Sequence, residues 1–138
     1  MRTTVHVRGG RGFSLIELML AAAVIAILVA IAIPAYRGYV LRAHRTEGKD
    51  LLTRLAQAQE RYYTAHNQYT DDFATLDQPQ TSPGSWYVAR IAVAGSSQAY
   101  TLTAVPQGAQ AADACADLTL DNTGVQGYSG NSGNGACW

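Results

Sequence analysis

One stretch of the chain, residues 13–33, limits more than any other what the protein can fold into. Only Ser14 and Glu17 within it carry polar side chains, and the run from Leu18 to Ile33 carries none. A helix over this stretch, at about 1.5 Å per residue, is roughly 30 Å long, which matches the hydrocarbon thickness of a bilayer. We therefore predict a membrane-competent helix over residues 13–36.

Glu17 is the exceptional residue of this helix. A carboxylate in a hydrophobic helix costs about 2.5–3.5 kcal/mol on insertion scales, so such a residue usually has a partner and a function. The acid lies close to the start of the apolar run, next to Ser14, Leu15 and Ile16. The sequence therefore marks Glu17 as a candidate functional residue.

Residues 1–12 form a short basic segment before the apolar run. Arg2, Arg8 and Arg11 are its charged residues, and it has no acid, which is typical of a targeting leader. An ordinary secretory signal peptide is the alternative, with Ala30-Ile31-Ala32 as its cleavage site. The length of the apolar run and the presence of Glu17 favour the first interpretation.

The formal net charge of zero conceals an uneven distribution. The three leader arginines are among ten basic residues, which leaves seven against ten acidic ones. Six of those seven lie between Arg37 and Arg61, and Arg90 is the only later base, against six aspartates. An acidic head disfavours direct binding of nucleic acid, so we do not expect nucleic acid among the partners.

Helical periodicity resumes after Pro34. A proline in a helix interior removes one hydrogen bond, so we expect a kink at Pro34; the alternative is a helix that ends at Ile33. Apolar positions then recur at helical spacing, with charged residues on the other faces. The members of this stripe are Leu41, His44, Gly48, Leu51, Leu52, Leu55, Ala58 and Tyr62.

From Trp86 onward the apolar period changes to two, which predicts strands. Alternation is seen in residues 86–94, 100–105 and 115–120, with a short fourth segment at 125–128. The links between them are hairpin-length, so the sheet should be antiparallel, with one apolar face. We predict an α+β fold in which the amphipathic half of one long helix packs on this small sheet.

The junction Gly12-Phe13-Ser14-Leu15-Ile16-Glu17, after a basic leader and before a long apolar helix, resembles the type IV prepilins. The resemblance implies the type IV pilin fold, cleavage between Gly12 and Phe13, and N-methylation of Phe13 by one membrane peptidase. It also implies that Glu17 serves assembly, by neutralising the Phe13 ammonium of a neighbouring subunit inside a helical filament. In such a filament the apolar helix forms the core.

The rest of the chain is most similar to minor pilins of the PilE type. The similarity lies in Arg45-Thr46-Glu47, Glu60-Arg61-Tyr62-Tyr63, Tyr100–Ala104, Leu118–Asp121 and Cys137-Trp138. It implies a structural pilus subunit in assembly or priming, which supports twitching motility and adhesion. A major pilin, a type II secretion pseudopilin and a pilus-associated DNA- or surface-binding subunit are the alternatives.

Cys115 and Cys137 are the two cysteines, both in the last quarter of the chain. Behind an N-terminal membrane signal the compartment is oxidising, so we predict a disulfide; two buried free thiols are the alternative. Such a disulfide would close the glycine-rich loop 129–138, which in pilins is often an exposed contact surface. The predicted organisation is a leader at 1–12, a transmembrane and filament-core helix at 13–36, and a periplasmic head at 37–138.

The predicted location is the bacterial inner membrane, as a single-pass precursor with a cytoplasmic N-terminus, and then the extracellular pilus. The partners would be other pilins, the peptidase that also methylates, and the inner-membrane assembly machinery. We find no pattern for catalysis, cofactor or metal, because His6, His44 and His66 lack ligand spacing with the cysteines. We expect Asp113, Asp117 and Asp121 to be solvated, and the protein to be a substrate rather than an enzyme.

Overall fold

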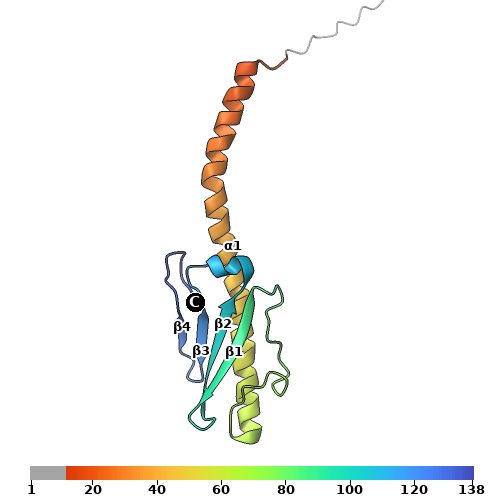
Figure 1. Cartoon of the computed structure of the whole chain (residues 1–138), viewed down its shortest axis with the longest axis vertical. Coiled ribbons are helices and arrows are strands. Elements are labelled where there is room, and N and C mark those ends of the chain that lie inside the picture. Colours follow the sequence, from red (N-terminus) through yellow and green to blue (C-terminus); the bar gives the residue numbers. More distant parts are fainter. Residues whose placement is uncertain (1–11) are drawn as a thin grey trace, which may run out of the picture. The chain divides into compact units, whose positions relative to one another are not determined.

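The computed structural model describes residues 12–138, so the predicted leader except for Gly12 lies outside the described residues. The chain divides into two compact units, Met1–Tyr36 and Arg37–Trp138. Helix α1 begins in the first unit and ends in the second (Figure 1). The second unit also contains all the strands.

Helix α1 covers Leu15–His66, and it continues through Pro34. Its C-terminus has a left-handed cap, because Asn67 has φ 54° and donates its backbone N–H to the Tyr63 carbonyl at 2.8 Å. Asparagine tolerates this conformation better than most residues, so it ends the helix at little cost. His66 occupies the last turn, where a basic side chain suits the helix dipole.

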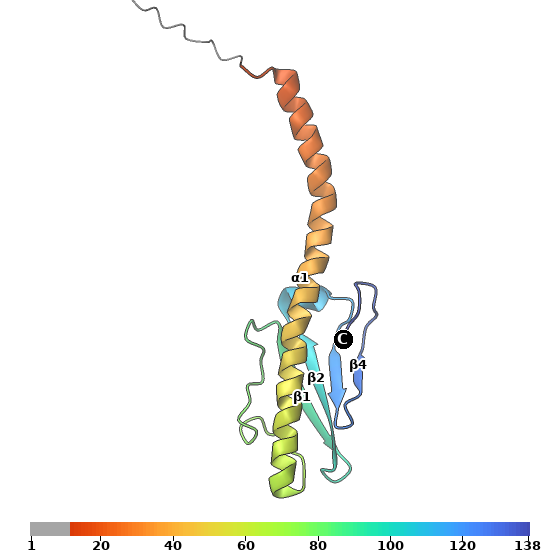
Figure 2. The same cartoon turned by 180° about the vertical axis from the view of Figure 1, so that it is seen from behind.

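Four antiparallel strands form one sheet in the order β1-β2-β3-β4. The strands are β1 (Tyr87–Ala94), β2 (Ala99–Pro106), β3 (Leu118–Asp121) and β4 (Gln126–Tyr128), with a 3₁₀ helix η1 at Gly108–Ala112. Within the second unit, one face of the sheet lies against α1, as the two opposite views show (Figure 1, Figure 2). The long helix on an antiparallel sheet confirms the predicted fold class.

The core lies between α1 and the sheet. Alternate residues of β1 and β2 point to the helix, so Tyr87, Ala89, Leu102 and Ala104 are fully buried. Opposite them the helix buries a stripe at helical spacing. Its buried members are Arg45, Gly48, Leu51, Leu52, Leu55, Ala58 and Gln59.

Two local features differ from the sequence prediction. Strand β3 begins at Leu118 instead of residue 115, because Ala116 has φ 52° and interrupts the extended backbone. Helix η1 lies in a segment for which no element was predicted. Both differences lie close in sequence to Asp113, which belongs to the candidate functional site.

Gly48 is a buried glycine at which α1 packs tightly against Tyr87 of strand β1. A Cβ built on Gly48 would lie 3.1 Å from the ring atoms of Tyr87. Tyr87 is itself fully buried and has little room to move. A larger side chain at position 48 would therefore have to displace the Tyr87 ring.

We predict that Gly48→Val lowers the free energy of unfolding by about 1–3 kcal/mol, because overpacking displaces the Tyr87 ring. Gln57→Val is the matched control, since it places the same side chain on the exposed face of α1. The control should cost less than about 1 kcal/mol, as expected for helix propensity alone. Denaturation of both variants, followed by tryptophan fluorescence, measures the difference; equal losses would contradict the role of Gly48.

Candidate functional site

The first unit presents an apolar helix surface that nothing in the described chain covers. Phe13 is 81% exposed and Ile31 is 68% exposed. The most apolar 18-residue window of α1 has a mean hydropathy of 2.9, and none of its residues is buried. Such a surface requires lipid or protein around it, because exposed apolar area of this extent is rare on monomeric proteins.

Glu17 has a partner within its own chain. Its Oε2 accepts a hydrogen bond from the backbone N–H of Ser14 at 3.2 Å. Ser14 precedes the first helical residue and Glu17 is the third helical residue, so the pair has the spacing of a capping box. Sequence reasoning missed this role, although the Ser-x-x-Glu pattern was present.

The predicted cleavage residues, Gly12 and Phe13, lie just before the helix in non-helical backbone.

In the second unit, Arg45 of α1 is the largest fully buried side chain. Its Nε donates to Oδ2 of Asp113 at 2.7 Å, and its Nη2 donates to Oδ1 at 2.6 Å. Arg45 is 1% exposed and Asp113 is 4% exposed, so this bidentate pair is removed from solvent. Bidentate geometry is what allows a buried pair to offset part of its desolvation cost.

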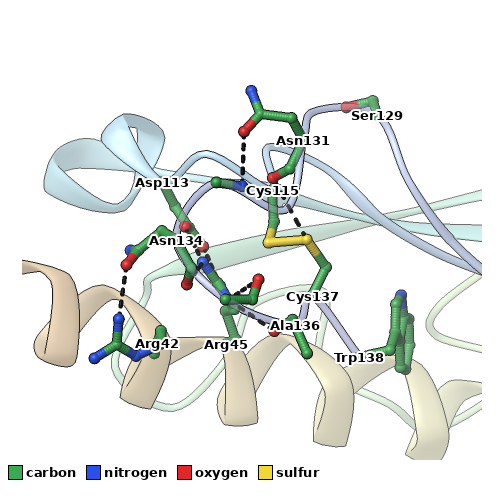
Figure 3. Close-up of a disulfide and its surroundings, with 12 residues drawn as sticks. Arg42, Arg45, Asp113, Cys115, Ser129, Asn131, Asn134, Ala136, Cys137 and Trp138 are labelled. Atoms are coloured by element: carbon green, nitrogen blue, oxygen red, sulfur yellow. Dashed lines mark hydrogen bonds and ion pairs between the residues drawn. A yellow bond between two sulfur atoms is a disulfide. The ribbon is translucent and has the colours of Figure 1, made fainter.

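The same guanidinium holds the C-terminal loop, here residues 129–138. Nη1 donates to the carbonyls of Ala136 at 2.8 Å and Gly135 at 3.4 Å, and Nη2 donates to the carbonyl of Asn134 at 3.1 Å. An arginine has five N–H donors, and here all five have acceptors. Figure 3 shows Arg45 reaching from α1 into the turn of this loop.

Gln110 of η1 connects this site to neighbouring residues. Its Nε2 lies 3.0 Å from the Tyr87 hydroxyl and 3.2 Å from Oδ2 of Asp113. Its Oε1 faces Nδ1 of His44 at 3.1 Å, and the His44 ring stacks on Trp86 with centroids 4.1 Å apart. Within residues 12–138, no buried side-chain polar atom lacks a hydrogen-bond partner.

The electrostatics of the site favour the charged form of Arg45. The hydrogen bond to Asp113 raises the pKa of Arg45, although burial opposes it. Burial lowers the pKa of Lys49, and the nearby Arg45 charge lowers it further. Burial also raises the pKa of Tyr87, so its hydroxyl remains protonated beside the pair.

A disulfide closes the loop that Arg45 holds. Cys115 and Cys137 are joined with an S–S distance of 2.08 Å and a Cα–Cα distance of 5.6 Å. Gly130 lies so close to the segment at Ala114 that a Cβ on it would overlap the Ala114 carbonyl oxygen. The neighbouring backbone N–H of Asn131 donates to that carbonyl at 2.8 Å. The loop is therefore tied at both ends and docked in its middle (Figure 3).

The expected solvation of the three late aspartates is wrong for Asp113, which is buried against Arg45. Asp121 instead caps a turn, because its Oδ1 accepts from the hydroxyl and backbone N–H of Thr123. These hydrogen bonds lower the pKa of Asp121. In the described part of the chain, no group of three or more His, Cys, Asp or Glu residues is arranged to hold a metal.

Comparison with known proteins gives the family. Residues 34–119, more than half of the chain, match the family described as type IV minor pilin ComP, DNA uptake sequence receptor. The chain belongs to this family of type IV minor pilins. Residues 8–33, a range that includes Gly12 and Phe13, match the prokaryotic N-terminal methylation motif.

Related pilins are found in several bacteria. The fimbrial protein EcpC of Eikenella corrodens is 34% identical over 110 residues, covering 80% of this chain and 71% of EcpC. The type IV major pilin PilA of Myxococcus xanthus is 43% identical over 61 residues, covering 44% of this chain and 28% of PilA. A type IV major pilin PilE1 of Neisseria gonorrhoeae is 35% identical over 85 residues, covering 61% of this chain and 40% of PilE1.

Solved structures agree with the fold. A type IV pilin from Shewanella oneidensis has a TM-score of 0.54 and 26% identity, covering 71% of this chain and 97% of that one. The non-core minor pilin PilV of Neisseria meningitidis has a TM-score of 0.56 and 24% identity, covering 72% and 95%. The second likeness shows the fold alone. Both support a pilin head built from α1 and the four-stranded sheet.

We predict that Arg45→Met lowers the free energy of unfolding by about 3–5 kcal/mol, because it leaves the Asp113 carboxylate buried without a partner. The double variant Arg45→Met, Asp113→Leu should recover most of this loss, since both charges are then removed. Denaturation of the detergent-solubilised chain with its disulfide intact provides the measurement.

The matched control is Arg54→Met. Arg54 pairs with Asp50 at 2.7 Å on the exposed face of α1, with side chains 59% and 47% exposed. Loss of an exposed pair should cost no more than about 1 kcal/mol. If Arg45→Met were as mild as Arg54→Met, Arg45 would not be the residue that stabilises this site.

Proposed function

We propose that this minor pilin is inserted in the inner membrane as a single-pass precursor and then assembled into a pilus. In this proposal the chain is cleaved between Gly12 and Phe13, and the new Phe13 amine is methylated. The observation that carries the proposal is the uncovered apolar surface of residues 13–33 in a member of the pilin family. Lipid covers that surface first, and the helices of other pilins cover it in the filament.

Glu17 has two candidate roles in this pathway. In the single chain it caps α1 through the Ser14 N–H. In the filament it would pair with the Phe13 ammonium of a neighbouring subunit, because two charges that are costly alone in a low-dielectric core are less costly together. The two roles are compatible, since a carboxylate has about four lone-pair sites for hydrogen bonds.

Pro34 and the docked loop would serve assembly in different ways. We propose that the missing backbone donor at Pro34 lets α1 bend or unwind locally when subunits pack. The loop closed by Cys115 and Cys137 is largely exposed and is the part of the head that other molecules meet.

The proposed role of the subunit is in pilus assembly or priming, supporting twitching motility and adhesion. We propose no enzymatic activity, and we place the chain as a substrate of the peptidase that cleaves and methylates it.

Mass spectrometry of the N-terminus tests the pathway. Protein should be taken from membranes and from sheared surface filaments of the native cell. A chain that starts at a methylated Phe13 is expected in both fractions, and in the filaments it should be scarce relative to the major subunit. A chain that starts near Ile33 would mean a secreted soluble protein, and the proposal would fall.

We predict that Glu17→Gln separates the two roles of Glu17. Glutamine keeps the capping hydrogen bond but not the charge, whereas Glu17→Ala loses both. If the trans pair controls assembly, both variants should be inserted and cleaved normally yet enter filaments several-fold less well than wild type. Normal incorporation of Glu17→Gln would leave only the capping role. The yield in sheared filaments, relative to cleaved protein in membranes, is the measurement.

DNA reception is a second candidate function, which we propose on one observation. The family that matches residues 34–119 is described as a DNA uptake sequence receptor. Exposed bases on the second unit include Arg54, Arg61 and Arg90, which would contact phosphates. Against it stand the exposed acids Asp71, Asp72 and Asp77 after α1. The acidic balance makes the pilus-subunit role the first proposal.

Titration of the solubilised chain with labelled duplex DNA, at several salt concentrations, tests the second candidate. If the head binds DNA, log affinity should fall linearly with log salt, and Arg90→Gln should reduce the slope by about 1. Asp77→Asn is the matched control, which should leave affinity unchanged or raise it. Absence of binding at low salt would remove DNA reception and leave the pilus-subunit proposal intact.

A further inference from the structure

The amide side chain of Asn134 has the setting of a chemical modification site. Of the four asparagines in the chain, Asn134 alone is followed by glycine. The others, at 67, 122 and 131, precede glutamine, threonine and serine. Glycine has no side chain, so its peptide nitrogen approaches the side-chain carbonyl of the preceding residue without steric obstruction.

Both ends of the Asn134 amide contact α1. Oδ1 accepts a hydrogen bond from Nη1 of Arg42 at 2.7 Å. Nδ2 donates to the carbonyl of Gly38 at 3.4 Å. Figure 3 shows the amide facing the Arg42 guanidinium from the C-terminal loop. A guanidinium is a cation that forms shorter and stronger hydrogen bonds to a carboxylate than to an amide.

We propose that Asn134 deamidates through Gly135, and that Arg42 then binds the new carboxylate as an ion pair. The Gly135 nitrogen loses its proton and bonds to Cγ of Asn134. The bond from Cγ to Nδ2 breaks, and ammonia leaves with a proton. Water then opens the cyclic imide at one of its two C–N bonds, which gives either aspartate or isoaspartate at residue 134.

The docked loop controls this reaction. Negative charge develops on Oδ1 during the attack, and the Arg42 guanidinium lies where it stabilises that charge. However, the Gly135 N–H donates to the Ser132 carbonyl at 3.0 Å, so this turn must open before the nitrogen can attack. Opening is opposed by Arg45, which binds the carbonyls of residues 134–136. The rate of deamidation therefore depends on how often the loop dissociates from Arg45.

The two products affect docking in opposite ways. Aspartate keeps the backbone and adds a negative charge beside Arg42, so it strengthens the contact with α1. Isoaspartate routes the main chain through Cγ, which adds one methylene to the backbone between Cα of residue 134 and its peptide bond to Gly135, and the former Asn134 carbonyl becomes a carboxylate that branches off the main chain. That product weakens docking, because the three carbonyls no longer converge on one guanidinium.

Peptide mass spectrometry in ¹⁸O-labelled water tests the reaction itself. The full chain, solubilised in detergent with its disulfide intact, is incubated in mildly alkaline buffer. Labelled acid should accumulate at residue 134 several-fold faster than at the three other asparagines, and reduction of the disulfide should accelerate it. Asn131 is the internal control, because it lies in the same loop. If residue 134 reacts no faster than Asn131, the proposal is overturned.

Asn134→Asp tests the ion pair without waiting for the reaction. Amide hydrogen exchange in residues 132–137 should be about twofold to fivefold slower than in wild type, the range of an exposed ion pair. Arg42→Gln is the partner variant, and the gain should disappear when both changes are combined. Exchange that is equal to or faster than wild type in Asn134→Asp would show that Arg42 does not receive the carboxylate.

Discussion

The buried pair between Arg45 and Asp113 is the interaction on which the head depends. Neither charge is tolerable alone in the core, so the pair requires α1, the segment after η1 and the C-terminal loop to be in place together. It thereby converts three stretches that are distant in sequence into one cooperative unit. The disulfide stabilises the same arrangement with a covalent bond, because Cys115 follows Asp113 by two residues.

The two units of the chain satisfy opposite requirements. Residues 37–138 form their own core between helix and sheet, with their buried polar side chains paired. Residues 13–36 have no such core, and their apolar surface is uncovered in the described chain. In the proposed pathway the same apolar surface exchanges lipid for neighbouring helices, while the head, which has its own core, remains folded. Stability of the head and assembly through the helix are therefore separable by mutation.

Sequence patterns predicted the elements of the fold but not the residues that connect them. Alternating and helical periodicities are local, so the helix stripe and the strands were visible, and the two cysteines suggested their bridge. Arg45 belonged to a helix rich in bases, and Asp113 to a set of three spaced aspartates, so nothing local marked their contact across 68 positions. The Ser-x-x-Glu spacing of Ser14 and Glu17 was visible in the sequence, but the apolar residues around Glu17 suggested a partner in another chain instead. Long-range pairing of charges required the structure.

The way the C-terminal loop is held has a mechanical consequence. A pull on residues 134–136 is transferred to α1 through one rigid, planar guanidinium with several bonds in parallel. The same side chain is also bound by the Asp113 carboxylate, so the load is shared between the helix and the segment that follows η1. A pull on the loop would thus reach α1 through Arg45 and the segment before β3 through the disulfide, so the tension is divided between the helix and the sheet.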